Sequence, residues 1–205
     1  MPKLSEDKRA ALEVIIGKGL TDVSILFDPA IIVAAEKDCL EGLHLLLPLT
    51  SDGAQHSALS QAATQGNLEF IRVLTSKVTF DEYSLNTALC NAIAEGHVSC
   101  VRFLLTVADP SYHESKALRA AAKGSRIECL KMLIPVSDAT AYESGPLQWA
   151  AGNGWVEGVK LLIPVSNPKS DHSVSLRRAV KGEHEECVKL LIPVSDPEIV
   201  KELGL

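Results

Sequence analysis

The sequence contains few aromatic residues and no long apolar run. Phe, Trp and Tyr make up 4% of the 205 residues, although hydrophobic residues as a whole make up 46%. A core of small and aliphatic side chains favours closely packed helices over a β-sandwich, whose strands are rich in aromatic and β-branched residues. Since no stretch of about 18 apolar residues occurs, we expect no membrane span.

We also expect neither a secretory leader nor a disulfide framework. The opening MPKLSEDKRA carries charges of both signs, and no apolar segment of the signal-peptide type follows it. The five cysteines are odd in number and scattered along the chain. We therefore expect a reducing compartment, which for this chain is the cytoplasm. A chain delivered into a host cell would meet the same conditions.

Several classes of function find no support in the sequence. The net charge of −6 argues against a general affinity for nucleic acid, although a local basic patch is compatible with it. There is no Gly-rich phosphate loop, CxxC or HExxH motif. No Ser or Cys is placed with a His and an acidic residue in a pattern that recurs along the chain. The sequence thus predicts no enzyme activity, no cofactor and no metal.

The main positive feature is an internal repeat, which decides the fold class wherever it occurs. The strings KMLIPVSD, KLLIPVSN and KLLIPVSD begin at Lys131, Lys160 and Lys189, 29 residues apart. Upstream of them, leucines recur with the same period, and earlier copies are less regular. The repeat leucines and their first, divergent counterpart are Ile31, Leu59, Leu89, Leu118, Leu147 and Leu176. We count six units, beginning near residues 29, 57, 87, 116, 145 and 174.

Each unit contains two apolar stretches with helical spacing. In the third unit Leu89, Ala92 and Ile93 fall on one helical face, and Gly96 then allows the left-handed residue that ends a helix. The links between units are rich in Pro, Ser, Asp and Asn, as turns are. A single helix pair cannot bury its apolar face, so the units must stack. We predict an all-α helical solenoid of about six helix pairs, forming one domain.

The two ends of the chain fit capping roles. Residues 1–28 contain one amphipathic helix that matches the second helix of a unit, and we assign them to an N-terminal cap. The six repeats then occupy residues 29–196. Residues 197–205 form a short C-terminal cap. The Asp-Pro pair that opens this segment, DPEIVKELGL, begins one residue earlier, at Asp196. Capping units keep the ends of a solenoid soluble.

The unit resembles the ankyrin repeat. In the third unit the match rests on Leu89, Ala92, Gly96, His97, Val98, Val101 and Leu104. The family's repeat is about 33 residues long, and the shortfall of this chain lies entirely in the links. We therefore expect the links to lack the family's β-hairpin fingers. The resemblance implies a protein that binds other proteins, and a family in which fold alone does not identify the partner.

Three cysteines and one glycine share a position in the second helix. Cys100, Cys129 and Cys187 are equivalent in the repeat, and Gly158 takes their place in the fifth unit. Neighbouring helices lie about 8–10 Å apart, whereas a disulfide needs Cα atoms within about 7 Å. We predict free, buried thiols and no zinc site.

The corner between the two helices of a unit carries large polar or aromatic residues. His97 and His184 occur at this position, and we expect them to bond to the backbone of the neighbouring link. Trp155 takes the same position in the fifth unit, where we expect a structural role.

The candidate binding residues lie on the first helices and in the links. Trp149 occupies a first-helix position that holds Gln61, Asn91, Ala120 and Arg178 in other units, so we expect that position to be exposed. The tyrosines are expected in the links; they are Tyr83, Tyr112 and Tyr142. Tyr and Trp are common anchors of binding surfaces. The alternative is that they only shield helix ends.

The first-helix side also becomes basic toward the C-terminal half. The residues concerned are Arg119, Lys123, Arg177, Arg178 and Lys181. They form either a solvated charged face or a docking surface for an acidic partner, where complementary charge would speed encounter. The second helices carry a more uniform stripe that we interpret as solvated, formed by Arg72, Arg102, Lys131, Lys160 and Lys189.

The sequence therefore supports a protein-interaction module. Its predicted binding side is the concave one, formed by the first helices and links. Two alternatives stay open. A small anionic ligand or nucleotide bound between Trp149 and the arginines would require a pocket with converging donors. The chain could also be the targeting part of a larger enzyme or effector, which only the full reading frame would show.

Overall fold

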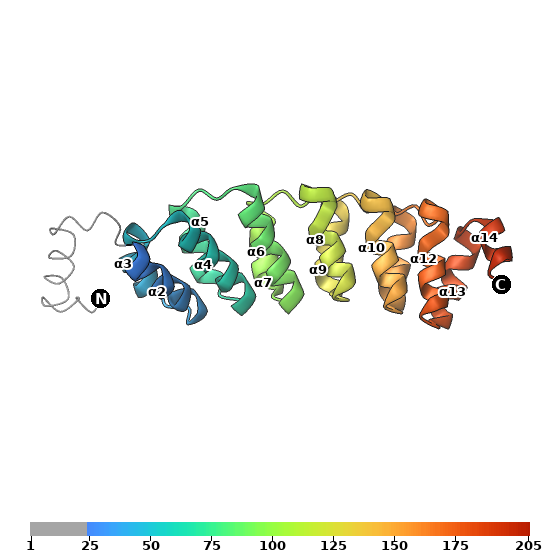
Figure 1. The fold of residues 1–205 in the computed structure, drawn as a ribbon, viewed down its shortest axis with the longest axis horizontal. Helices are drawn as coiled ribbons and strands as arrows, with labels where there is room; N and C mark the ends of the chain where they lie inside the picture. The colour runs from blue at the N-terminus through green and yellow to red at the C-terminus, as the bar shows by residue number, and fades with distance from the viewer. Residues whose placement is uncertain (1–23) are drawn as a thin grey trace, which may run out of the picture.

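The protein is a row of helix pairs stacked side by side (Figure 1). A computed structural model of the chain describes residues 24–205. The first helices of units one to six are α2 (Ser24–Glu36), α4 (Asp52–Gln65), α6 (Glu82–Glu95), α8 (Tyr112–Lys123), α10 (Ala141–Gly152) and α12 (Ser170–Lys181). The second helices are α3 (Leu40–Leu46), α5 (Leu68–Lys77), α7 (Val98–Leu104), α9 (Ile127–Leu133), α11 (Val156–Leu162) and α13 (Glu185–Leu191). A last short helix, α14 (Pro197–Glu202), follows unit six.

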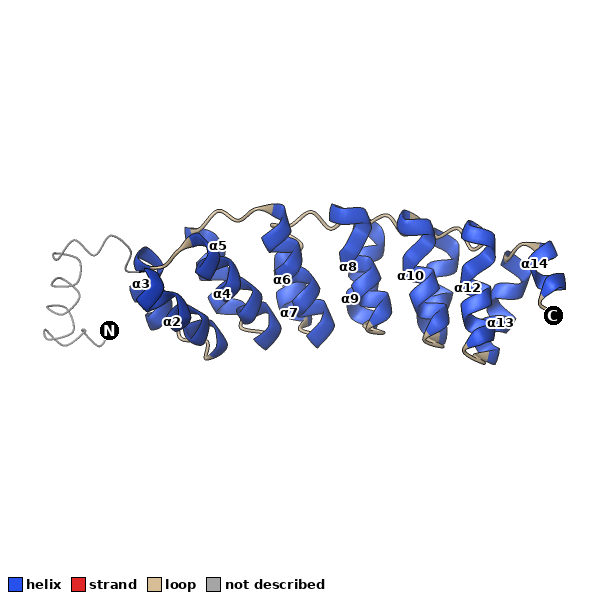
Figure 2. Ribbon diagram, viewed as in Figure 1, coloured by secondary structure: helices blue, strands red, loops and turns tan. Residues whose placement is uncertain are grey.

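The links contain short 3₁₀ helices or no regular structure. Four links carry such a helix, namely η1 (Leu47–Leu49), η2 (Ile134–Val136), η3 (Ile163–Val165) and η4 (Ile192–Val194). Each has a proline in its first two positions, where the missing N–H leaves no hydrogen bond unmade. No strand occurs between residues 24 and 205 (Figure 2), which confirms the prediction of links without β-hairpin fingers.

One continuous apolar core runs through the stack. The repeat leucines Leu59, Leu89, Leu118, Leu147 and Leu176 are fully buried and belong to a single cluster. The first helices of neighbouring units pack on one another more extensively than the second helices do. The predicted helical solenoid is thus confirmed. The predicted N-terminal cap, residues 1–28, lies mostly outside the described residues.

The first helices begin four or five residues earlier than the units counted in the sequence. In α6 the reason is an N-cap: the Asp81 carboxylate accepts the backbone N–H of Ser84 at 2.8 Å. The expectation that the three tyrosines lie in links is therefore wrong. Tyr83, Tyr112 and Tyr142 lie in the first turns of α6, α8 and α10.

In units four to six, the first helix opens with a left-handed turn. Three consecutive residues have φ between 46° and 60° in each of α8, α10 and α12. The last of each three is a buried serine: Ser115, Ser144 or Ser173. Its Oγ accepts the backbone N–H of the residue 23 positions onward at 2.8–2.9 Å. Each of these units is thereby tied to the link that follows it.

The corner residues bond to the preceding unit. His97 Nε2 donates to the carbonyl of Thr64 at 2.9 Å, and His184 Nε2 donates to that of Gly152 at 3.0 Å. The expected histidine bonds to backbone are therefore present, but they reach the end of the neighbouring first helix and not the link. The last carbonyls of a helix have no partner within it, which makes them available acceptors.

Candidate partner-binding surface

The first-helix face comprises the exposed side chains of α2, α4, α6, α8, α10 and α12. At its C-terminal half, two cations lie over the indole ring of Trp149 in α10. Lys123 Nζ is 5.0 Å from the ring centroid, and Arg178 Cζ is 5.5 Å from it. Lys123 ends the preceding first helix and Arg178 lies on the following one, so three units contribute. Both distances fall within the range of a cation–π contact.

Trp149 itself is less exposed than the sequence suggested. Its side chain is half-buried and packs against the core cluster. Gln61 and Asn91 at the equivalent positions are also half-buried, whereas Arg178 is exposed, so a polar residue at this position does not imply exposure. Long side chains from the two adjacent units can cover an aromatic ring that stands between them. The ring is therefore a shared packing element as well as a surface group.

Arg177 is engaged within the protein. Its guanidinium forms two hydrogen bonds with the Glu202 carboxylate on α14, at 3.1 and 2.7 Å, and Nε donates to the carbonyl of His172 at 3.2 Å. The hydrogen bond from Arg177 lowers the pKa of Glu202 below its ordinary value. Arg177 therefore holds the C-terminal helix in place.

Arg119 occupies the equivalent position in unit four and is also engaged. Its Nη1 donates to the carbonyl of Glu114 at 2.6 Å, and its guanidinium carbon lies 4.7 Å from the ring centroid of Tyr142. In unit five Gln148 makes the matching bond, from Nε2 to the carbonyl of Glu143 at 2.8 Å. Long polar side chains at this position thus hold the left-handed turn, a role that sequence reasoning missed.

Three of the five predicted basic residues stay available. Lys123, Arg178 and Lys181 are exposed. Within the described part of the chain, none of the three has a carboxylate within 4.0 Å. The structure therefore concentrates unneutralised positive charge on α8 and α12, on either side of Trp149.

The other predicted site residues are more dispersed. Asn91 Nδ2 donates to Ser60 Oγ at 2.7 Å and joins α6 to α4, and Gln61 on α4 is half-buried. Tyr83 and Tyr142 are each 64% exposed, whereas Tyr112 is half-buried. These residues lie along the same row of first helices without forming one cluster around Trp149.

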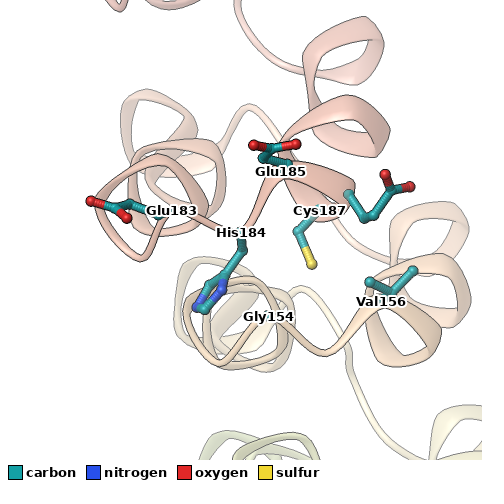
Figure 3. A pocket seen from close by; sticks show the side chains of 7 residues that line it. Gly154, Val156, Glu183, His184, Glu185 and Cys187 are labelled. Carbon is teal, nitrogen blue, oxygen red and sulfur yellow. The ribbon is translucent and has the colours of Figure 1, made fainter.

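Two surface depressions of about 310 Å³ lie at the C-terminal end of the stack. One is lined by His184, Glu185 and Cys187, with Gly154 and Val156 from unit five (Figure 3). Neither depression is lined by Trp149 or by the three available cations. No three His, Cys, Asp or Glu side chains among residues 24–205 come together as a metal site.

Burial works against activation of four of the five cysteine thiols. All five are unpaired, and burial raises the pKa of the Cys90, Cys100, Cys129 and Cys187 thiols above the ordinary value. A thiol with a raised pKa is a poor nucleophile at neutral pH. His184, the neighbour of Cys187 in the depression, is already bonded to a backbone carbonyl.

Comparison with known proteins gives one family. The family model described as ankyrin repeats (3 copies) matches residues 31–114 and 117–201. The crystal structure of the human ASB11 ankyrin repeat domain superposes with a TM-score of 0.65, covering 80% of this chain and 82% of that one at 21% sequence identity. At that identity the likeness shows the fold alone. No curated protein matches the sequence. None of the helices described here is both long enough and apolar enough to cross a bilayer.

Proposed function

The chain belongs to the ankyrin repeat family, and from this membership we propose that it is an interaction module that binds a partner protein through the first-helix face of units four to six. The observation that carries the proposal is the group of three unpaired cations on α8 and α12, two of which, Lys123 and Arg178, lie over Trp149. In a protein of net charge −6, such a local excess of positive charge attracts an oppositely charged surface.

On the opposite side of the stack, three of the five cations of the second-helix stripe are paired, whereas Arg102 and Lys160 have no carboxylate within 4.0 Å in the described chain. Arg72, Lys131 and Lys189 on the second helices each lie within 4.0 Å of a glutamate three residues earlier in the same helix. Exposed ion pairs of this kind contribute little to stability, but they neutralise the stripe locally. The second-helix stripe is therefore a solvated surface in this proposal.

A small-molecule site is less well supported. Ligand pockets enclose most of their ligand and supply a few converging polar groups. Neither of the two depressions is lined by Lys123, Trp149 or Arg178. A targeting role inside a larger effector would use the same surface, and the unpaired thiols fit the reducing compartment expected from the sequence.

The proposal is tested by capture followed by substitution. Tagged protein is used to isolate partners from the native cell extract, and the affinity of each partner is then measured with purified components. We expect Arg178→Glu to weaken binding about thirtyfold, equivalent to about 2 kcal/mol, the effect of losing an interface anchor.

Lys160→Glu is the matched control, because Lys160 is an exposed cation of the second-helix stripe. It should leave the affinity nearly unchanged, and both variants should keep the wild-type helical content. Binding that is abolished by Lys160→Glu and untouched by Arg178→Glu would place the partner on the other side of the stack.

A further inference from the structure

The cations around Trp149 are ordered by the protein itself. Lys123 and Arg178 come from first helices on either side of α10, and both lie over the same ring. Long basic side chains normally lose rotamer freedom when a partner fixes them, which weakens binding. Contacts with the ring reduce that loss because they restrict the side chains before binding.

We propose that Lys123, Trp149, Arg178 and Lys181, hereafter the basic ladder, bind an acidic stretch of a partner protein, with Trp149 as a positioning residue that holds the two cations. This inference rests on the proposed function and specifies its partner. Carboxylates of the partner meet Lys123, Arg178 and Lys181, while the indole stays within the stack.

Charge complementarity identifies the occupant as acidic. The three cations have no carboxylate within 4.0 Å in the described chain. The positions equivalent to Trp149 in units two to four hold uncharged residues, namely Gln61, Asn91 and Ala120. That repeat position therefore adds no positive charge in units two to four, and the charge of the basic ladder lies toward the C-terminal half, which suits a short acidic segment and not a long polyanion.

Nearby acidic residues argue against a long polyanion such as nucleic acid. Glu183 and Glu185 follow Lys181 at the corner of unit six, and both are exposed. A nucleic acid strand carries a charge at every phosphate and gains affinity by neutralising several of them. It would be repelled by these glutamates and by the net charge of −6, whereas a short peptide can avoid them.

The burial of Trp149 supports its positioning role. The side chain is half-buried against the core, and its ring is approached by both cations. A ring that is packed and covered in this way has little area left for insertion into a partner. Its substitution should therefore act through Lys123 and Arg178.

The first experiment measures binding of a fluorescent peptide of eight glutamates by anisotropy, with a peptide of eight glutamines and a single-stranded oligonucleotide for comparison. Only the glutamate peptide should bind. Its affinity should fall steeply between about 0.1 M and 1 M salt, as the screening length drops from about 10 to about 3 Å. Lys123→Gln and Arg178→Gln should each weaken binding about two- to fivefold, as for an exposed ion pair, and Lys160→Gln should not.

A double-mutant cycle then tests the role of Trp149. Trp149→Leu should weaken peptide binding in the wild-type background and have no further effect in the Lys123→Gln/Arg178→Gln background, since the cations that it positions are gone. Trp149→Phe should recover part of the loss, because it restores a ring. An equal loss in both backgrounds would make Trp149 a direct anchor and overturn the positioning role.

The outcomes separate this inference from the function on which it rests. The inference of an acidic partner is overturned if the glutamate peptide does not bind. It is also overturned if the glutamine peptide or the oligonucleotide binds equally well. If a captured partner still responds to Arg178→Glu in that case, the first-helix face remains the binding surface. If the partner does not respond either, both proposals fail.

Discussion

At the scale of single residues, Trp155 and Gly158 occupy two positions whose side chains must fit together. A Cβ added at Gly158 would lie 2.1 Å from Trp155 Cε3, far inside van der Waals contact. In unit six the same two positions hold His184 and Cys187, and the imidazole turns instead toward the carbonyl of Gly152. The indole thus takes the space that a cysteine fills elsewhere, which also explains the structural role expected for Trp155.

This fit predicts a compensating pair of substitutions. Gly158→Cys alone should destabilise the protein by about 1–3 kcal/mol, because the new side chain collides with the indole. Adding Trp155→His should recover most of that loss by recreating the combination found in unit six. Urea unfolding of the two single variants and the double variant measures the coupling. Strictly additive effects would show that the two positions do not share one space.

At the scale of helices, the sequence predicted the elements well and their beginnings poorly. The 29-residue period and the repeat leucines were sufficient to predict the helix pairs, because both patterns follow from the burial of one face of each helix. The left-handed turns were missed because residues such as Tyr142, Glu143 and Ser144 have φ values of 53°–60° without any glycine to signal it. Contacts with neighbouring segments fix these turns, and such contacts are not local in sequence.

The same limit explains why the internal role of long polar side chains on the first helices was missed. Arg119, Gln148 and Arg177 look like variable surface residues, but each bonds to a carbonyl of the left-handed turn. The equivalent positions in units two and three hold Ser60 and Cys90. α4 and α6 begin instead with ordinary N-caps. In units two to six, a long polar side chain at this position therefore occurs together with a left-handed turn, and a short one occurs together with an N-cap. This correlation was the available signal in the sequence, but it can be interpreted only once the turns are known.

The buried serine of the left-handed turn should matter for stability. Ser144 Oγ accepts the backbone N–H of Asn167 at 2.8 Å, and Ser144 is fully buried. Ser144→Ala leaves that N–H without its partner and should cost about 1–3 kcal/mol in urea unfolding. Ser57→Ala is a suitable control, because Ser57 is exposed and bonds only to its own helix. Equal, small effects of both changes would contradict a role for the serine in joining units.

The N-cap of α6 predicts a dependence of stability on pH. Hydrogen bonds from the side chain and backbone of Ser84 lower the pKa of Asp81. A carboxylate with a lowered pKa in the folded state stabilises the protein above its unfolded pKa of about 3.9, and this contribution is lost as pH falls through the folded value. Asp81→Asn keeps a capping side chain but does not titrate.

The difference in unfolding free energy between wild type and Asp81→Asn should therefore be constant above about pH 5 and shrink on acidification below about pH 4. Urea unfolding over this pH range measures it. A difference that grows toward low pH would show that the carboxylate is not stabilised in the folded protein.

At the scale of the whole molecule, the chain is an extended stack in which units pack mainly on their neighbours. The candidate surface spans three of these units, since Lys123, Trp149 and Arg178 lie on α8, α10 and α12. Its geometry therefore depends on how firmly unit six stays stacked on unit five. On its other side, unit six is joined to α14 by the contact of Arg177 with Glu202.

Linear arrangement makes the effect of a core substitution depend on where the unit lies. Leu118 and Leu176 are fully buried leucines at equivalent positions of units four and six. Either change to Ala should cost about 2–5 kcal/mol locally. A central unit can unfold alone only by breaking the interfaces on both of its sides, whereas the last unit breaks a single interface with another full unit. Leu176→Ala should therefore release unit six before the rest unfolds, and Leu118→Ala should lower the stability of the stack as a whole.

Hydrogen exchange at residue resolution distinguishes the two cases. In Leu176→Ala, amides of α12, α13 and α14 should lose protection first while those of α4 and α6 keep it, and the urea transition should broaden or split. In Leu118→Ala the loss should spread over the described helices within one transition. Because Arg178 and Lys181 lie on α12, the first variant should also bind the glutamate peptide more weakly under conditions in which the rest of the stack is intact. A single sharp transition with unchanged slope in Leu176→Ala would mean that cooperativity extends well beyond neighbouring units.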